Sequence, residues 1–310
     1  MDIEFLKVLY YNIFKSTLKE QRMKVLVTGA SGFIGTELVK KLVKTSQVVG
    51  IDLKPAKFES RNYTHIRCDC ANTVEFFKAC AKFDFDVVYH LAATVGVQNF
   101  VGDAVSDSLM NNINIDNNMM RYLLVHPKTK IFFTSSSEVY GDCYGASEIA
   151  PVNIKITPRS SYAIEKLMFE TFLRTRPGSV ILRLFNIIGP GQDPSKGVVA
   201  KFYKAIKEGS PVTIAKGCSR SFCDVRDAIG EILAISEPGT YNIGSNLITL
   251  EIEDLFQRMT KFFGLEPPVT KFVPGPDEIF DRSPNLGKIL KLYKPVYKLE
   301  DTLKSFKNIL

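Results

Sequence analysis

The chain has 310 residues, of which 45% are hydrophobic and 24% are charged, and its formal net charge is +7. These values indicate a soluble globular protein with one large domain or two coupled lobes, and they weakly favour anionic small molecules as ligands. The basic residues are spread along the chain without a dense Lys/Arg tract, so we do not expect a nucleic-acid-binding protein.

The apolar runs and the cysteines indicate whether the chain spans a membrane, binds a metal or forms disulfides. No apolar run reaches the length of about 18 residues that a membrane span needs, so no span is expected. The six cysteines show no usual zinc spacing. We therefore expect no metal site, and we interpret the cysteines as free thiols in a reducing, cytoplasmic compartment.

Residues 1–22 form an N-terminal extension whose apolar residues can line one side of a helix. The segment lacks the cleavage pattern of a signal peptide. Met23 stands directly before the first expected strand. We interpret the extension as a helix that packs on the domain or on a partner chain, with a membrane-surface helix as the alternative.

Short apolar segments alternate with helical patterns along residues 23–190. This alternation predicts an α/β fold with a parallel, doubly wound sheet that helices cover on both faces. Strands are expected at 24–28, 47–52, 63–69, 86–91, 130–135 and 179–184, and helices at 33–44, at 104–125 and from near residue 161.

The pattern changes after residue 190 to helices, short strands and proline-containing turns, without a clean linker. We expect residues 191–310 to form mainly a smaller α/β lobe over the carboxyl edge of the sheet. Ligands bind at that edge in doubly wound folds, so this lobe is the predicted substrate-binding part.

A glycine-rich turn joins the first expected strand to the first expected helix. Gly29 permits a tight turn, Gly32 lets the backbone approach a pyrophosphate at the helix N-terminus, and Gly35 lets the helix pack close to the sheet. Asp52 ends the next strand, as the dinucleotide-binding (Rossmann) pattern requires. The segment therefore predicts a dinucleotide site.

Two aspartates indicate which dinucleotide binds. Asp52 can accept hydrogen bonds from both ribose hydroxyls and would repel a 2′-phosphate, which favours NAD over NADP, although Lys54 nearby keeps NADP open. Asp69, at the end of the third strand, can bind the adenine amine, with a simple turn aspartate as the alternative.

A tyrosine and a lysine stand one helical turn apart. Tyr162 and Lys166 share one helix face, and a lysine ammonium beside a phenol and the positive ring of the cofactor lowers the phenol pKa. The tyrosinate can then take a hydroxyl proton while the same carbon loses hydride. Upstream, a serine-rich strand end leads into Glu138.

Taken together, the motifs resemble a known family. TGASGFIG (28–35), HLAA (90–93), Asn114, SSSEVYG (135–141), YAIEK (162–166) and LRLFNIIGP (182–190) occur in the order seen in extended short-chain dehydrogenase/reductases that act on nucleotide sugars. The resemblance covers about residues 23–305. It implies an NAD that is recycled in each turnover and a nucleoside-diphospho-sugar in the C-terminal lobe.

The resemblance also implies roles for individual residues. Ser136 matches the serine that hydrogen-bonds the sugar O4, Tyr162 matches the base, and Lys166 matches its partner that holds the nicotinamide ribose. NAD contacts are implied for Gly29, Ser31, Gly32, Phe33, Ile34, Gly35, Asp52, Asp69, Leu91, Ala92, Ala93, Asn114, Tyr162 and Lys166, and substrate contacts for Ser137, Asn186, Arg220 and Arg282.

The family members share oxidation at C4 and differ in the next step. Ser137 is a poor proton donor for a leaving hydroxyl, which disfavours a 4,6-dehydratase. A 4-epimerase needs only the Ser/Tyr/Lys set. The Ser-Glu-Val-Tyr-Gly run most resembles UDP-glucuronate decarboxylases, which implies that Glu138 and Arg282 act at the reacting centre.

Several alternatives stay open from the sequence. Glu138 can instead cap a turn, and either arginine can be a solvated surface charge. The loop 215–219 is short and lacks an aromatic residue at Ala215, which leaves the nucleotide base open. A non-catalytic NAD-binding module is the alternative outside the enzymes. The resemblance finally implies a homodimer through the helices near 104–125 and 161–175.

Overall fold

The computed structural model describes residues 22–95, 104–141, 143–148, 160–193, 196–265, 270–274 and 281–306. The helix predicted within residues 1–22 falls outside the described part. Among the described residues, no helix combines the length and the apolar character that a membrane crossing needs.

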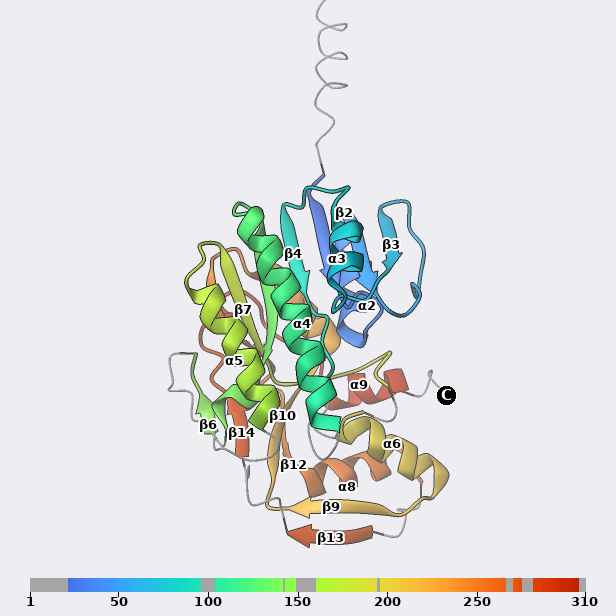
Figure 1. Cartoon of the computed structure of the whole chain (residues 1–310). Helices are drawn as coiled ribbons and strands as arrows, with labels where there is room; N and C mark the ends of the chain where they lie inside the picture. The colour runs from blue at the N-terminus through green and yellow to red at the C-terminus, as the bar shows by residue number, and fades with distance from the viewer. Residues whose placement is uncertain are drawn as a thin grey trace, which may run out of the picture.

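A seven-stranded sheet, parallel throughout, forms the centre of the molecule, in the order β11-β7-β5-β4-β1-β2-β3. It confirms the predicted doubly wound α/β class (Figure 1). The strands are β1 (Lys24–Thr28), β2 (Gln47–Asp52), β3 (Tyr63–Arg67), β4 (Val87–His90), β5 (Lys130–Ser136), β7 (Ser179–Leu184) and β11 (Gly239–Ile243).

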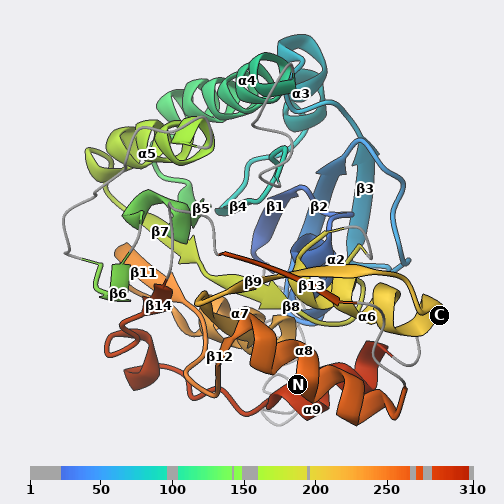
Figure 2. The ribbon, with the colours of Figure 1, turned by 90° about the horizontal axis from the view of Figure 1, so that it is seen from below.

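Helices cover both faces of this sheet (Figure 2). One face carries α3 (Thr73–Cys80), α4 (Ala104–Val125) and α5 (Ser160–Arg174), and the other carries α2 (Phe33–Leu42) and α7 (Val225–Ala234). The apolar run of β1 follows from this double cover, because Val27 packs into one cluster and Leu26 into the other.

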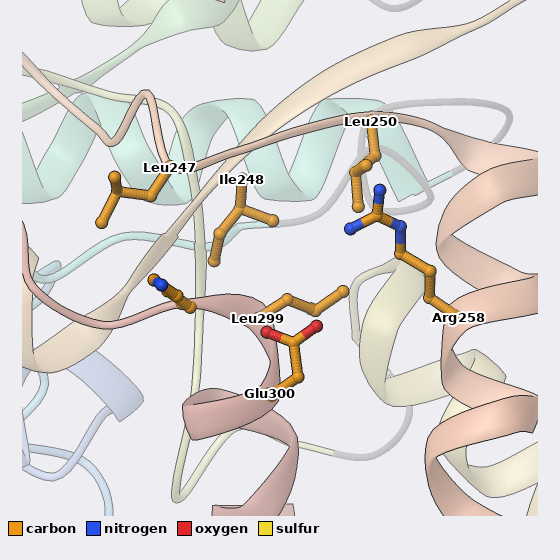
Figure 3. A pocket seen from close by; sticks show the side chains of 7 residues that line it. Leu247, Ile248, Leu250, Arg258, Leu299 and Glu300 are labelled. Atoms are coloured by element: carbon orange, nitrogen blue, oxygen red, sulfur yellow. The ribbon is translucent and has the colours of Figure 1, made fainter.

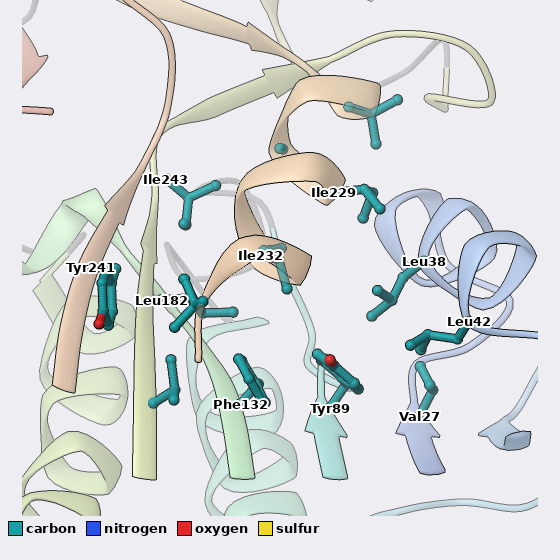
Figure 4. Packing of buried hydrophobic residues seen from close by; sticks show 14 of the residues in the cluster. Val27, Leu38, Leu42, Tyr89, Phe132, Leu182, Ile229, Ile232, Tyr241 and Ile243 are labelled. Atoms are coloured by element: carbon teal, nitrogen blue, oxygen red, sulfur yellow. The ribbon is translucent and has the colours of Figure 1, made fainter. Parts of the chain in front are cut away.

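The cluster beneath α2 and α7 is continuous across the sheet (Figure 4). Ile229 and Ile232 of α7 and Leu38 of α2 lie over side chains that β1, β4, β5, β7 and β11 contribute. This packing fixes the position of α2 relative to the sheet. The first turn of α2 follows β1 at the predicted cofactor site.

The order in which successive strands are added to the sheet reverses at β1, which pairs with β2 on one side and with β4 on the other. Thr28 and His90, the last residues of β1 and β4, are register partners there. In open parallel sheets this switch point opens the crevice in which ligands bind. The predicted glycine turn follows directly after Thr28.

A second sheet lies beyond the carboxyl ends of the strands and has the order β12-β10-β14-β6, with β8 also paired to β10. Its strands come from both sides of residue 190, and β11 from beyond that residue joins the main sheet. The two-part division at residue 190 therefore stays a prediction. The strands are β6 (Cys143–Ala146), β8 (Asn186–Ile188), β10 (Ser219–Asp224), β12 (Ile248–Glu251) and β14 (Asp281–Pro284).

The remaining elements gather around this second sheet (Figures 1 and 2). Side chains of α6, α8 and α9 share one apolar cluster with β10 and β12. A separate parallel pair joins β9 to β13. Their bounds are α6 (Val198–Glu208), α8 (Ile252–Phe263), α9 (Leu299–Phe306), β9 (Val212–Lys216) and β13 (Thr270–Pro274).

The predicted elements agree closely with the observed ones. The bounds predicted for β1, β2, α4 and β7 are those of the structure, and β3, β4, β5, α2 and α5 differ by one or two residues at an end. The helix α3 was not predicted. Asn72 is the N-cap of α3, because its side-chain oxygen accepts hydrogen bonds from Val74 N at 3.0 Å and from Glu75 N at 3.2 Å.

Candidate active site

The glycine turn brings β1, α2 and the end of β4 into close contact. Gly29 has φ 71°, a conformation that favours glycine. A Cβ on Gly35 would lie 2.0 Å from the carbonyl oxygen of Gly29. The predicted purposes of both residues, a tight turn and close helix packing, agree with this geometry.

The turn also presents donors suited to an anion. Gly32 begins α2 without a side-chain hydrogen bond to the first-turn N–H groups. These groups and the helix dipole suit a phosphate. Asp52 accepts from Ser31 N at 3.0 Å and from Lys54 N at 2.9 Å, which fixes the turn relative to β2. The residues present thus suit a dinucleotide, and the contact of Asp52 with its ribose stays a prediction.

The neighbouring strand ends complete this crevice. Thr28 Oγ1 accepts from Leu91 N and from Ala92 N, both at 3.2 Å. Asp69 accepts from Ala71 N at 2.9 Å, so it makes the turn contact that the alternative interpretation expects. Its role towards an adenine stays a prediction.

Ser136 and Glu138 lie where β5 ends. A 3-10 helix, η2 (Ser137–Tyr140), follows the strand, and Ser136 Oγ accepts from Glu138 N at 3.2 Å. Ser136 therefore caps this turn. The serine keeps its own hydroxyl proton to donate. Glu138 is close enough to Tyr162 for its charge to raise the pKa of that phenol.

Tyr162 and Lys166 share one face of α5, as predicted. Lys166 Nζ lies 5.8 Å from the centroid of the Tyr162 ring and 5.0 Å from that of Phe133. Lys166 is only 1% exposed. Burial raises the pKa of Tyr162, and the Lys166 charge opposes that effect in the predicted direction without outweighing it.

A buried ion pair ties α5 to the sheet next to these residues. Arg183 of β7 donates through Nε and Nη2 to the two oxygens of Glu170, at 3.0 and 2.7 Å. Ser135 donates to the same carboxylate at 2.5 Å. Arg183 also lies over the Tyr140 ring, 4.6 Å from its centroid. These contacts set the position of α5 relative to the end of β5.

Sequence reasoning missed a buried polar network behind Lys166. His90 Nδ1 lies 2.8 Å from Thr28 Oγ1, and His90 Nε2 lies 3.1 Å from Asp116 Oδ1. Glu165 Oε1 lies 3.3 Å from Lys166 Nζ. The acidic residue within the Tyr162-Ala-Ile-Glu-Lys166 motif was the available signal, but the positions of the other members depend on the packing of α4 on α5.

Asparagines of α4 differ in burial. Asn114 is exposed, and its predicted contact with NAD stays a prediction. Asn112, two residues earlier on the buried side, donates to Glu165 Oε2 at 3.1 Å and accepts from Thr94 N at 2.7 Å. Sequence reasoning missed Asn112, because only the rotation of the helix distinguishes the asparagines that stand close together there.

Three of the four predicted substrate residues, Asn186, Arg220 and Arg282, belong to the second sheet, and Ser137 is buried in η2. Arg220 of β10 and Arg282 of β14 are register partners in neighbouring strands, although 62 positions of sequence separate them. Asn186 is the partner of Phe222, and it donates to Ser221 O at 3.0 Å. The structure thus brings the two arginine positions together and gives Asn186 a structural bond.

In the part of the chain that the structure describes, neither a hollow beside β12 nor a metal-binding cluster adds to the predicted site. A hollow of about 160 Å³ lies between β12, α8 and α9 (Figure 3) and holds none of the predicted residues. Leu250, Arg258 and Glu300 line part of it. Within the described ranges, no group of three or more His, Cys, Asp or Glu residues is arranged to hold a metal ion.

Comparison with known proteins identifies the family. The model of the NAD dependent epimerase/dehydratase family matches residues 25–244. The chain belongs to this family. Its cofactor is therefore NAD, as the glycine turn and Asp52 predicted.

Relatives of the NAD dependent epimerase/dehydratase family have different activities. An uncharacterised UDP-glucose epimerase of Bacillus subtilis is 31% identical over 69% of this chain and 72% of its own length. UDP-glucuronic acid decarboxylase 6 of Arabidopsis thaliana is 28% identical over 92% and 88%. The structure of UDP-glucuronic acid 4-epimerase from Bacillus cereus with UDP-glucuronic acid and NAD has a TM-score of 0.80, 29% identity and coverage of 93% and 100%.

The close approach at Gly35 gives a testable prediction. In Gly35→Ala, the added Cβ must push α2 away from the Gly29 carbonyl, so we expect a loss of about 1–3 kcal/mol in stability and at least about ten-fold weaker NAD binding. Thermal unfolding and calorimetric titration with NAD measure both effects.

Gly287→Ala is the matched control, because its Cβ meets only Asn285 Oδ1, at 3.2 Å. It should bind NAD like the wild type. An unchanged NAD affinity in Gly35→Ala would contradict the proposed position of the pyrophosphate.

Proposed function

We propose that this chain is a nucleotide-sugar decarboxylase that converts UDP-glucuronate to UDP-xylose or releases the 4-keto pentose. The observation that carries the proposal is the proximity of Glu138 to Tyr162, whose pKa it raises. A 4-epimerase has no evident use for a carboxylate there. Relatives described as acting on UDP-glucuronic acid, a decarboxylase and an epimerase, support the choice of substrate.

The side chains have separate tasks in this reaction. Ser136 donates a hydrogen bond to the sugar O4, and Tyr162 as tyrosinate takes the O4 proton. Lys166 keeps positive charge near that phenolate. Bound NAD would supply the hydride acceptor at C4 and later the hydride donor.

Loss of carbon dioxide follows from the C4 ketone. The C6 carboxylate then belongs to a β-keto acid, so the C5–C6 bond breaks and its electron pair moves into an enolate at O4. Glu138 delivers a proton to C5, which restores the ketone. The neighbouring positions Arg220 and Arg282 supply cations for the diphosphate and the carboxylate.

A UDP-sugar 4-epimerase is the second candidate, because epimerases are as similar to the chain as decarboxylases are. It needs Ser136, Tyr162 and Lys166 but no acid at Glu138. A 4,6-dehydratase ranks third, since Ser137 stands where that reaction needs an acid. A non-catalytic NAD-binding module ranks last, because Tyr162 and Lys166 are both in place.

Incubation with UDP-glucuronate distinguishes these candidates. We expect release of CO₂ without net formation of NADH, and a loss of about 10²–10⁴-fold in rate for Tyr162→Phe. The measurement is trapped ¹⁴CO₂ together with product chromatography. Formation of UDP-galacturonate without CO₂ would establish the epimerase instead, and no turnover of any UDP-sugar would favour the binding module.

Glu138→Gln tests the carboxylate itself. The amide cannot deliver a proton to C5, so we expect CO₂ release to fall by about 10²-fold or more while NAD affinity stays unchanged. Glu148→Gln is the control carboxylate, since Glu148 accepts from Asn242 N at 3.1 Å and leaves the Tyr162 phenol untouched. Wild-type CO₂ release by Glu138→Gln would show that Glu138 has no role in the decarboxylation.

We also propose a cytoplasmic homodimer through α4 and α5. These helices pack side by side and expose large apolar side chains, Met110, Leu124, Ile164 and Met168. None of the described cysteine side chains forms a disulfide, and the side chain of Cys143 lies outside the described part. Thiols that form no disulfide suit a reducing compartment. Light scattering should give twice the chain mass, and Met168→Glu should halve it; a monomeric wild type would refute the interface.

A further inference from the structure

Two carboxyl groups lie behind Lys166 on the two helices that cover this face of the sheet. Asp116 belongs to α4 and Glu165 to α5, and they are 6% and 2% exposed. The two side chains lie close enough to share a hydrogen bond that shifts the pKa of both. Two ionised carboxylates cannot form such a bond, because neither carries a donor.

Two buried carboxyl oxygens without a hydrogen-bond donor support one proton shared between Asp116 and Glu165. Asp116 Oδ2 and Glu165 Oε1 are buried and have no donor among the described groups. Lys166 Nζ lies at ion-pair distance from Glu165 Oε1, 3.3 Å, but outside hydrogen-bond geometry. A proton between the carboxyls is the donor that both oxygens lack.

The net charge of the buried cluster also supports one shared proton. The surrounding groups are Lys166 and Tyr162 on α5, Asn112 on α4, His90 on β4 and Phe133 on β5. Burial, and next the Lys166 charge, lower the pKa of His90 to about 3, so this ring is neutral. One ammonium then faces two carboxyl groups, and a single shared proton leaves the buried cluster without net charge.

We propose that Asp116 and Glu165 are positioning residues for the Tyr162–Lys166 pair: with one shared proton they balance the buried ammonium, and their charge sets the proton affinity of Tyr162. Burial raises the pKa of both carboxyls, that of Glu165 to about 7. Burial alone would lower the pKa of Lys166, but Asp116 and Glu165 reverse the direction and raise it.

The charge of the carboxyl pair changes the proton affinity of Tyr162 in one direction. Below about pH 7 the carboxyl pair carries one negative charge, and above it the pair carries two. Each added negative charge disfavours the tyrosinate, and both carboxyls act on Tyr162 in this direction. The pair therefore opposes ionisation of the base as the pH rises.

The experiment measures protons directly and uses no sugar, so its failure is independent of the proposed decarboxylation. Difference infrared spectra of the purified full chain should show a protonated carboxyl that ionises near pH 7. The same transition should be absent from Glu165→Gln and from Asp116→Asn. These are near-isosteric variants, and Asp116→Asn keeps the test available if Glu165→Gln does not fold.

The second readout is the apparent pKa of Tyr162, taken from the alkaline absorbance difference between each variant and its Tyr162→Phe counterpart. With one negative charge fewer, Glu165→Gln and Asp116→Asn should each lower this pKa by about one unit. Circular dichroism over the same pH range verifies that the fold persists.

Glu231→Gln is the control, because Glu231 is also fully buried and burial raises its pKa to about 9, but it lies on α7, on the face of the sheet opposite to α5. It should keep both the transition near pH 7 and the Tyr162 pKa. If the infrared transition survives Glu165→Gln and Asp116→Asn, or if their Tyr162 pKa equals that of the wild type, the proposal is wrong.

Discussion

The burial of the Lys166 ammonium is the constraint on which the arrangement of the site depends. A charged group taken out of water is strongly destabilising unless opposite charge accompanies it. Lys166 is 1% exposed, and its compensating groups, Asp116 and Glu165, come from two different helices. The packing of α4 against α5 is therefore an electrostatic requirement as well as an apolar one. The same packing holds Tyr162 at the carboxyl edge of the sheet.

A second buried ion pair determines where α5 sits relative to the strands. Glu170 binds Arg183 of β7 and Ser135 of β5, so two strands and one helix meet at a single carboxylate. Ser136 and Glu138 follow directly after Ser135. Because loss of either partner would leave an uncompensated buried charge, this pair is expected to resist drift between α5 and the end of β5. Proton transfer depends on that spacing, since a base must lie within hydrogen-bond reach of its proton.

Local sequence patterns were sufficient for six strands of the main sheet and for the cofactor, while β11 was not predicted. The run of β1 is apolar because both of its faces are covered, and the glycines after it are required by contacts as close as the 2.0 Å approach at Gly35. Such constraints act between residues close in sequence and leave a readable pattern. The helix α3 was missed because its eight residues are too few for a clear period, and Asn112 was missed because a run of asparagines does not show which one faces the packed side of its helix.

The sequence by itself determined the doubly wound class, the dinucleotide turn and the Tyr162–Lys166 spacing, because each depends on residues within one or two neighbouring elements. Only the tertiary structure decided that Arg220 and Arg282 are register partners and that Asp116 meets Glu165 behind Lys166. Those relations join segments far apart in the chain. For Asp116 and Glu165 the physical cause is the burial of the Lys166 charge between packed layers, and a charge can be compensated by any residue that the fold brings near it.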